Sequence, residues 1–319
     1  MNLTATPSQT SRHSVALLVT AQALYVCCSA IGLTLTGLVG AMLAPNRAWA
    51  TLPFALVTVA TALSTGPVSL AMARYGRRPL FVLGALAGAA GGGLAAWAIA
   101  HGSFILFCVA NMALGVFQAN AQYYRFAATE VAEETFKPRA IGLVIGGGVL
   151  AAVAGPTLAS WARDALAPHT FAGSYLTVVA LALLSLVVLW RLALPLGTVT
   201  AKDAVTPSLW HIARQPSFIA AACNGAVGYA VMMFVMTATP LAVVGCGLPV
   251  AGAAAVIQWH LVCMFAPGFF TGKLIARFGA RAIVLCGIAL FALGTVAALS
   301  GLSLAQFGMA LALNGVAWN

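Results

Sequence analysis

The sequence predicts an all-α protein that crosses a membrane many times. Of its 319 residues, 62% are hydrophobic and only 6% are charged, whereas soluble domains carry about 25% charged residues. The mean hydropathy is +1.01. A soluble fold could not cover its surface with so few polar side chains, so lipid is expected to surround most of the chain. This composition excludes an ordinary soluble globular protein.

Ten apolar stretches are long enough to span a bilayer, which takes about 20 residues. In order, they are 14–44, 49–72, 79–100, 103–128, 138–161, 171–194, 217–243, 249–272, 282–300 and 302–319. The first stretch is too long for the core of a cleavable export signal, so we expect a spanning helix there. The last stretch runs to Asn319 without a charged flank.

Basic residues are distributed unevenly between the two sides of the membrane. If the stretches alternate in direction, one side holds only Arg47 and Arg163. The other side holds most of the Lys and Arg, namely Arg12, Arg74, Arg77, Arg78, Lys137, Arg139, Arg191, Lys202, Arg214, Lys273, Arg277 and Arg281. Basic loops face the cytoplasm, so we expect a cytoplasmic N-terminus in a bacterial inner (plasma) membrane. Charges clustered in short loops do not favour nucleic acid as a partner.

The chain divides into two weakly repeated halves. Its longest polar stretch, 195–216, is predicted to be a cytoplasmic linker between a six-helix bundle at 1–194 and a second bundle at 217–319. Arg74-Tyr75-Gly76-Arg77-Arg78 has a counterpart in Arg277-Phe278-Gly279-Ala280-Arg281, 203 positions later. Phe107 and Gly115-Val116 are similarly echoed by Phe307 and Gly315-Val316, 200 positions later.

On these residues the chain resembles the major facilitator superfamily, whose transporters consist of two six-helix halves. The basic loop of that family is matched by Arg74, Gly76, Arg77 and Arg78, but Ala73 stands where the family usually has an acidic residue. The resemblance implies a gating or topological role for this loop. It also implies twelve helices, so the ten stretches predict a two-half bundle that lacks its last two helices.

Two helices carry pairs of soft metal ligands at four-residue spacing. Met232 and Met236 lie in the seventh stretch, and His260 and Met264 in the eighth. With a rise of 1.5 Å per residue, both pairs lie about 15 Å below the outer surface, near the middle of the bilayer. Thioethers select Cu(I) over hard ions. The residues therefore predict a copper site, with weaker candidates at Cys223, Cys246 and Cys263.

This pair of motifs resembles the CcoA-like copper transporters, a branch of the same superfamily. The resemblance implies uptake of copper, as Cu(I), across the inner membrane by alternating access, to supply assembly of a cbb3-type cytochrome oxidase. Copper or a small copper complex is then the substrate, the lipid bilayer is the other partner, and no prosthetic group is expected.

Two alternatives remain open. The fourth stretch is the most polar, and with Gly155-Pro156 it favours a transporter of an organic solute or drug in which the Met and His residues only pack. Its polar side chains include Asn111, Gln118, Asn120, Gln122 and Arg125.

Arg125 of that stretch is expected either to anchor the helix at the membrane surface and pair with Glu130, or to act on substrate or in gating. The second alternative, favoured by the missing helices, is a non-transporting copper-holding protein or an inactive fragment. No motif predicts an enzyme.

Overall fold

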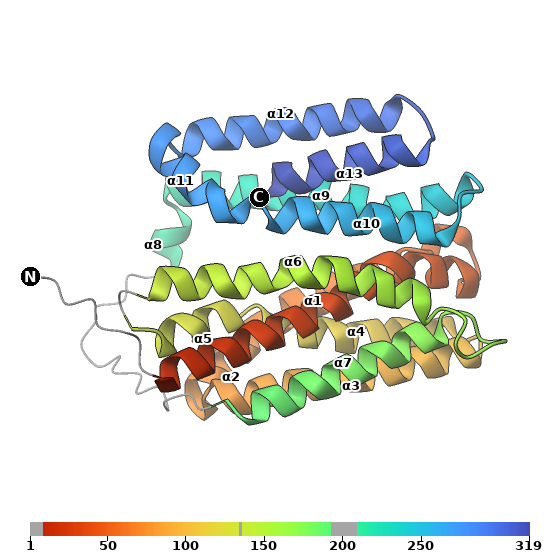
Figure 1. Ribbon diagram of the computed structural model, residues 1–319, viewed down its shortest axis with the longest axis horizontal. Coiled ribbons are helices and arrows are strands. Elements are labelled where there is room, and N and C mark those ends of the chain that lie inside the picture. The colour runs from red at the N-terminus through yellow and green to blue at the C-terminus, as the bar shows by residue number, and fades with distance from the viewer. Residues whose placement is uncertain (1–8, 134–135, 193–208) are drawn as a thin grey trace, which may run out of the picture.

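The computed structural model describes residues 9–133, 136–192 and 209–319, and every regular element in these ranges is helical. Within these ranges, eight helices are long and apolar enough to cross a membrane, and nine if one bent pair counts as a single span. A further apolar helix, Leu304–Trp318, is shorter. The helices lie side by side along one long axis (Figure 1). The prediction of an all-α polytopic membrane protein is confirmed.

The first part of the chain forms seven α-helices and one short 3₁₀ turn. They are α1 (Gln9–Leu43), η1 (Arg47–Trp49), α2 (Leu52–Tyr75), α3 (Arg77–Ala100), α4 (Phe104–Ala121), α5 (Tyr124–Val131), α6 (Lys137–Trp161) and α7 (Ala172–Trp190). Around α1 they bury a core in which Phe81, Phe107, Tyr124 and Tyr175 are fully enclosed. Phe81 and Tyr124 pack edge to face, with ring centroids 4.8 Å apart.

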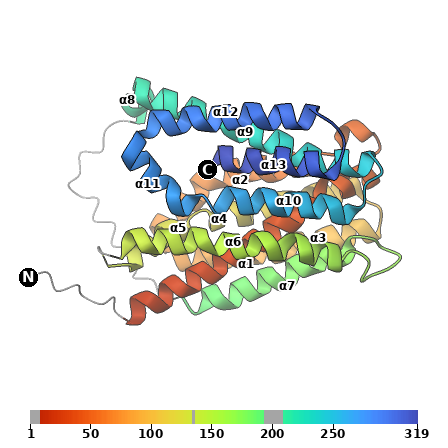
Figure 2. The ribbon, with the colours of Figure 1, turned by 45° about the horizontal axis from the view of Figure 1, so that its top comes forward.

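The second part forms α8 (Leu209–Ala213), α9 (Pro216–Gly245), α10 (Val250–Phe265), α11 (Gly268–Phe278), α12 (Ala280–Leu299) and α13 (Leu304–Trp318). A smaller core joins α9, α10 and α13 through Met232, Ile257 and Leu311. Figures 1 and 2 show these helices beside the earlier ones, and α10 packs against α6 where the two groups meet.

Two predicted spans each contain a break between two helices. The stretch 103–128 is divided between α4 and α5, which together still form one candidate span, Phe104–Val131, whereas the stretch 249–272 bends by 42° between α10 and α11. Pro267 lies at the second break. Proline has no backbone N–H and its ring clashes with the preceding turn, so it bends a helix even inside an apolar run.

The predicted linker at 195–216 is only partly visible. Its residues 195–208 lie outside the part of the chain that the structure describes. Beyond them, 209–213 form the short helix α8, and Pro216 is the first residue of α9. The division into bundles at 1–194 and 217–319 stays a prediction.

The repeated basic loops have the same backbone conformation. Gly76 joins α2 to α3 with φ 83° and ψ 163°, and Gly279 joins α11 to α12 with φ 80° and ψ 153°. This region of backbone space is open essentially to glycine alone. Glycine at both positions therefore follows from the tight turn between two helices.

Candidate functional site

A cavity of about 490 Å³ lies among α1, α2, α4, α5, α6, α9, α10 and the end of α13. Ligand pockets for small molecules occupy roughly 300–1,000 Å³, so this volume suits a small organic solute. The helices that surround it come from both parts of the chain. The two parts therefore share one central site.

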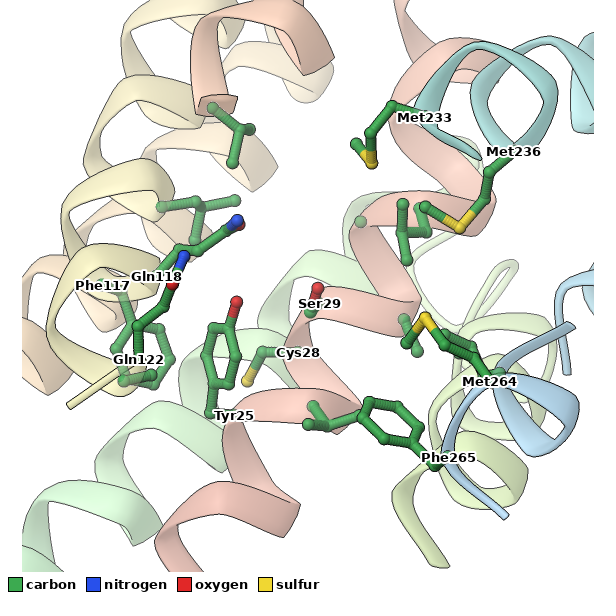
Figure 3. A pocket seen from close by; sticks show the side chains of 18 of the residues that line it. Tyr25, Cys28, Ser29, Phe117, Gln118, Gln122, Met233, Met236, Met264 and Phe265 are labelled. Atoms are coloured by element: carbon green, nitrogen blue, oxygen red, sulfur yellow. The ribbon is translucent and has the colours of Figure 1, made fainter. Parts of the chain in front are cut away.

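One wall of the cavity carries side-chain amides from α4. Asn111 and Gln118 belong to α4, Gln122 follows at its C-terminus, and all three line the cavity. Separations of seven and four residues place them on one face of the helix. Gln118 and Gln122 lie on the same side of the cavity in Figure 3. We call Asn111, Gln118 and Gln122 the amide wall.

The opposite wall consists of thioethers. Met232, Met233 and Met236 come from α9 and Met264 from α10. Figure 3 shows Met233, Met236 and Met264 across the cavity from Gln118 and Gln122. Thioethers are apolar and polarizable, and they make favourable contacts with aromatic rings. We call these four residues the thioether wall.

Aromatic rings complete the enclosure. Tyr25 of α1 packs edge to face on Phe117, with ring centroids 5.3 Å apart. Tyr229 of α9 packs on Trp318 at 5.6 Å. Phe265 of α10 also lines the cavity. Flat apolar surface is thus available on several sides of a bound molecule.

The lining carries almost no formal charge. Among the described residues that line the cavity, Arg125 is the single one with a charged side chain. Burying an ionised group without a partner is costly. The cavity is therefore suited to an uncharged molecule that combines ring surface with groups able to hydrogen bond to amides.

The structure brings together only part of the predicted metal site. Met232, Met236 and Met264 line the cavity, but His260 does not. His260 is fully buried, and its Nδ1–H donates to the carbonyl oxygen of Leu311 on α13 at 2.9 Å. The imidazole is therefore held in the packing of α10 against α13.

The cysteines do not assemble around the methionines either. Cys223 and Cys246 are exposed, Cys263 is half-buried, and none of the three lines the cavity. Cys28 of α1 does line it, although the sequence did not single it out. Within the described ranges, no group of three or more His, Cys, Asp or Glu side chains could hold a metal ion.

The basic loop between α2 and α3 fastens three helices together. Arg77 pairs with Glu130 of α5 through both carboxylate oxygens, with Nε donating to Oε2 at 2.7 Å. Arg78 donates to the carbonyl oxygen of Trp190 at the end of α7 and lies over its ring. Arg74 lies over the ring of Tyr75. Glu130 thus pairs with Arg77, and Arg125 lies in the cavity lining.

Close helix contacts lie beside the cavity. Toward the C-terminus of α1, a Cβ added at Gly37 would lie 3.5 Å from the Leu241 side chain of α9. Toward its N-terminus, α6 meets α10 and α11. There, a Cβ at Gly148 would lie 3.1 Å from the ring of Phe265, and one at Gly146 would lie 2.9 Å from the ring of Phe269. At Gly146 and Gly148 the absence of a side chain lets α6 approach its neighbours closely.

Sequence reasoning missed the contribution of α1. Gln22, Tyr25 and Ser29 line the cavity from this helix. Their spacing of three and four residues puts polar groups on one face of an apolar helix. That pattern was a usable signal, because polar side chains inside a membrane span are costly and tend to be functional.

An all-helical membrane bundle with a shared cavity between its two groups of helices has the architecture of a solute transporter. Residues 26–319 match the family model of the Major Facilitator Superfamily. The chain belongs to this superfamily, as its resemblance on Arg74, Gly76, Arg77 and Arg78 suggested.

Known relatives agree with this assignment. The chain is 43% identical to the riboflavin transporter RfnT of Brucella anthropi, over 98% of this chain and 79% of the relative. It is 28% identical to an uncharacterized MFS-type transporter of Bacillus subtilis, over 91% of this chain and 71% of that protein.

Solved structures share the fold. The partially occluded, inward-open xylose transporter XylE of E. coli matches with a TM-score of 0.68 at 14% identity, over 98% of this chain and 83% of that one. The nucleoside transporter NupG matches with a TM-score of 0.67 at 12% identity, over 98% of this chain and 80% of that one. At such low identity these likenesses concern the fold alone.

The prediction of copper transport is wrong. The relative at 43% identity is a transporter of riboflavin, an organic solute. The predictions of copper as substrate and partner, of metal binding, and of membership in the CcoA-like branch are therefore wrong as well. The error has a physical origin, since a thioether suits a soft metal ion and an aromatic ring equally well. The alternative of an organic solute fits better.

Proposed function

We propose that this chain moves riboflavin, or a closely related flavin, across the membrane by alternating access. The observation that carries the proposal is its 43% identity, over nearly its whole length, to a riboflavin transporter. The cavity supports it, because riboflavin is uncharged and joins a flat three-ring system to polar carbonyl and N–H groups. These features match the aromatic rings, the thioether wall and the amide wall.

Counterflow in proteoliposomes tests this proposal without assuming a direction of transport. Vesicles that contain the full chain are loaded with unlabelled riboflavin and diluted into a trace of labelled riboflavin. We expect labelled riboflavin to accumulate transiently, and excess external riboflavin to abolish the accumulation. An equal excess of D-xylose should have no effect. Accumulation no greater than in protein-free vesicles would refute the proposal.

We also propose that the membrane is a bacterial inner membrane and that the N-terminus faces the cytoplasm. The strong excess of Lys and Arg on one side supports this orientation. Alkaline phosphatase, which is active only outside the cytoplasm, should be active when fused after Asn46 and inactive when fused after Gly76. The reverse pattern would overturn the orientation.

In this proposal the two helical groups rock against each other about the cavity, as in related transporters. The segment 195–216 would link them on the cytoplasmic side. The contacts between Gly37 of α1 and Leu241 of α9, and between Gly148 of α6 and Phe265 of α10, join the two groups, so they would have to change as the groups rock.

A further inference from the structure

Asn111 is a buried amide whose oxygen has no hydrogen-bond partner. Its side chain is 0% exposed, and its Nδ2 donates to the carbonyl oxygen of Phe107 at 2.8 Å. Oδ1 receives no hydrogen bond from any described part of the protein. An unpaired buried acceptor is costly, and Asn111 belongs to the cavity lining although its side chain exposes no surface. A bound molecule that moves a neighbouring side chain aside would reach Oδ1 and supply the missing donor.

Asn120 on the same helix provides a natural comparison. It is 1% exposed, its Nδ2 donates to the carbonyl oxygen of Val116 at 2.9 Å, and its Oδ1 is also unpaired. However, Asn120 does not line the cavity. It packs against α3, where a Cβ added at Gly84 would lie 2.6 Å from the Asn120 Cβ. Position in the cavity wall therefore distinguishes Asn111.

The two walls of the cavity differ in the chemistry that they can recognise. The amide wall can accept and donate hydrogen bonds, whereas the thioether wall offers apolar contact to a ring. Figure 3 shows Gln118 and Gln122 on one side, and Met233, Met236 and Met264 on the other. A molecule with one polar edge and one apolar edge would be held in a single orientation between them.

We infer that Asn111 determines specificity by accepting a hydrogen bond from the imide N–H of the bound flavin, whose dimethylbenzene edge faces the thioether wall. This inference rests on the proposed function. The flavin ring system has a pyrimidinedione edge with one N–H between two carbonyl groups. The N–H can donate to Asn111 Oδ1, and Gln118, which lines the same face of α4, can donate to an adjacent carbonyl.

A substrate analogue tests the hydrogen bond directly. In 3-methylriboflavin a methyl group replaces the imide hydrogen, and the rest of the molecule is unchanged. We expect 3-methylriboflavin to compete with labelled riboflavin about tenfold more weakly than riboflavin does in the wild-type protein, since it loses a donor and leaves Oδ1 unpaired. Equal competition by the two compounds would overturn the inference.

Matched variants locate the effect at Asn111. In Asn111→Leu, the KM for riboflavin should rise about 3- to 10-fold, and the preference for riboflavin over 3-methylriboflavin should disappear. Asn120→Leu should keep the wild-type preference. A preference retained in Asn111→Leu, or lost equally in Asn120→Leu, would contradict the assignment.

Folding defects can be separated from loss of recognition. If Asn111→Leu does not reach the membrane at wild-type abundance, Asn111→Ser and Asn120→Ser form a second matched pair, because serine is too short to replace the amide. If neither pair is abundant enough, the comparison of the two compounds in the wild-type protein decides. Failure of wild-type counterflow with riboflavin itself would instead reject the proposed function.

Discussion

Gly115 and Gly315, 200 positions apart in the sequence, make the same kind of contact in the structure. A Cβ on Gly115 of α4 would lie 2.4 Å from the carbonyl oxygen of Val57 on α2, and one on Gly315 of α13 would lie 2.5 Å from that of His260 on α10. Each glycine lets its helix rest directly on the backbone of a neighbour. The repeat seen in the sequence is therefore a repeat of helix packing.

Adding a methyl group at either position should destabilise the protein. Gly115→Ala and Gly315→Ala place a Cβ against rigid backbone, which we expect to cost about 1–3 kcal/mol each through overpacking. Gly308→Ala on α13 is the control, because a Cβ there would have nothing within 4 Å. In a background that lacks the other five cysteines, a thiol-reactive fluorophore reports exposure of the buried Cys27 and Cys28 on heating and so measures the change. Equal midpoints for Gly315→Ala and Gly308→Ala would contradict this account.

The Arg77–Glu130 pair should contribute modestly to stability. Arg77 is in the first turn of α3 and Glu130 in the last turn of α5, so each charge alone opposes the dipole of its own helix. Both side chains are partly exposed to solvent, so we expect a coupling energy of about 0.5–1 kcal/mol that falls with salt. A double-mutant cycle with Arg77→Ala and Glu130→Ala, read as thermal stability at two salt concentrations, measures it. Additive effects of the two substitutions would rule out the coupling.

The thioether wall should tolerate other apolar side chains. Met236→Leu keeps the volume and apolarity, so the KM for riboflavin should change by no more than about tenfold. Met236→Gln has nearly the same length but adds a polar amide, and it should raise the KM further. Initial rates of riboflavin uptake at matched protein abundance measure both effects. Complete loss of transport in Met236→Leu would point to a chemical need for sulfur.

Cross-linking α1 to α9 should stop transport. The Leu241 side chain lies 3.5 Å from the Cβ position of Gly37, so cysteines at these two positions can be joined by a short thiol-specific cross-linker. In a background without native cysteines, Gly37→Cys with Leu241→Cys should lose counterflow on cross-linking with a disulfide-containing reagent. A reductant should restore it. Gly37→Cys alone is the control, and undiminished counterflow in the cross-linked double variant would argue against movement at this contact.

Hydropathy alone predicted the helical membrane fold, because burying polar backbone in lipid requires long helices of apolar residues. Hydropathy did not reveal the breaks between α4 and α5 and between α10 and α11. The stretch 249–272 is predominantly apolar, and Pro267 divides it because proline bends a helix whatever the hydropathy of its neighbours. Hydropathy measures solubility in lipid and says little about the direction of a helix axis.

The site was only partly predictable for a related reason. A four-residue spacing places His260 and Met264 on one face of α10, but it does not tell which neighbour that face meets. In the structure Met264 lines the cavity, whereas His260 hydrogen bonds to α13. Gly315 allows α13 to pack closely against α10 there. The amides of α4 were visible in the sequence, yet only the fold shows Gln118 across the cavity from the methionines of another helix (Figure 3).

The methionines also make the cavity sensitive to its chemical surroundings. Oxidation converts a methionine into its sulfoxide, which is polar and chiral. Dedicated reductases reverse this oxidation. Met233 and Met264 are only partly buried, so an oxidant that enters the cavity can reach them. Oxidative stress would then make the thioether wall polar without any change in the sequence, and reduction of the sulfoxides would restore its apolar surface.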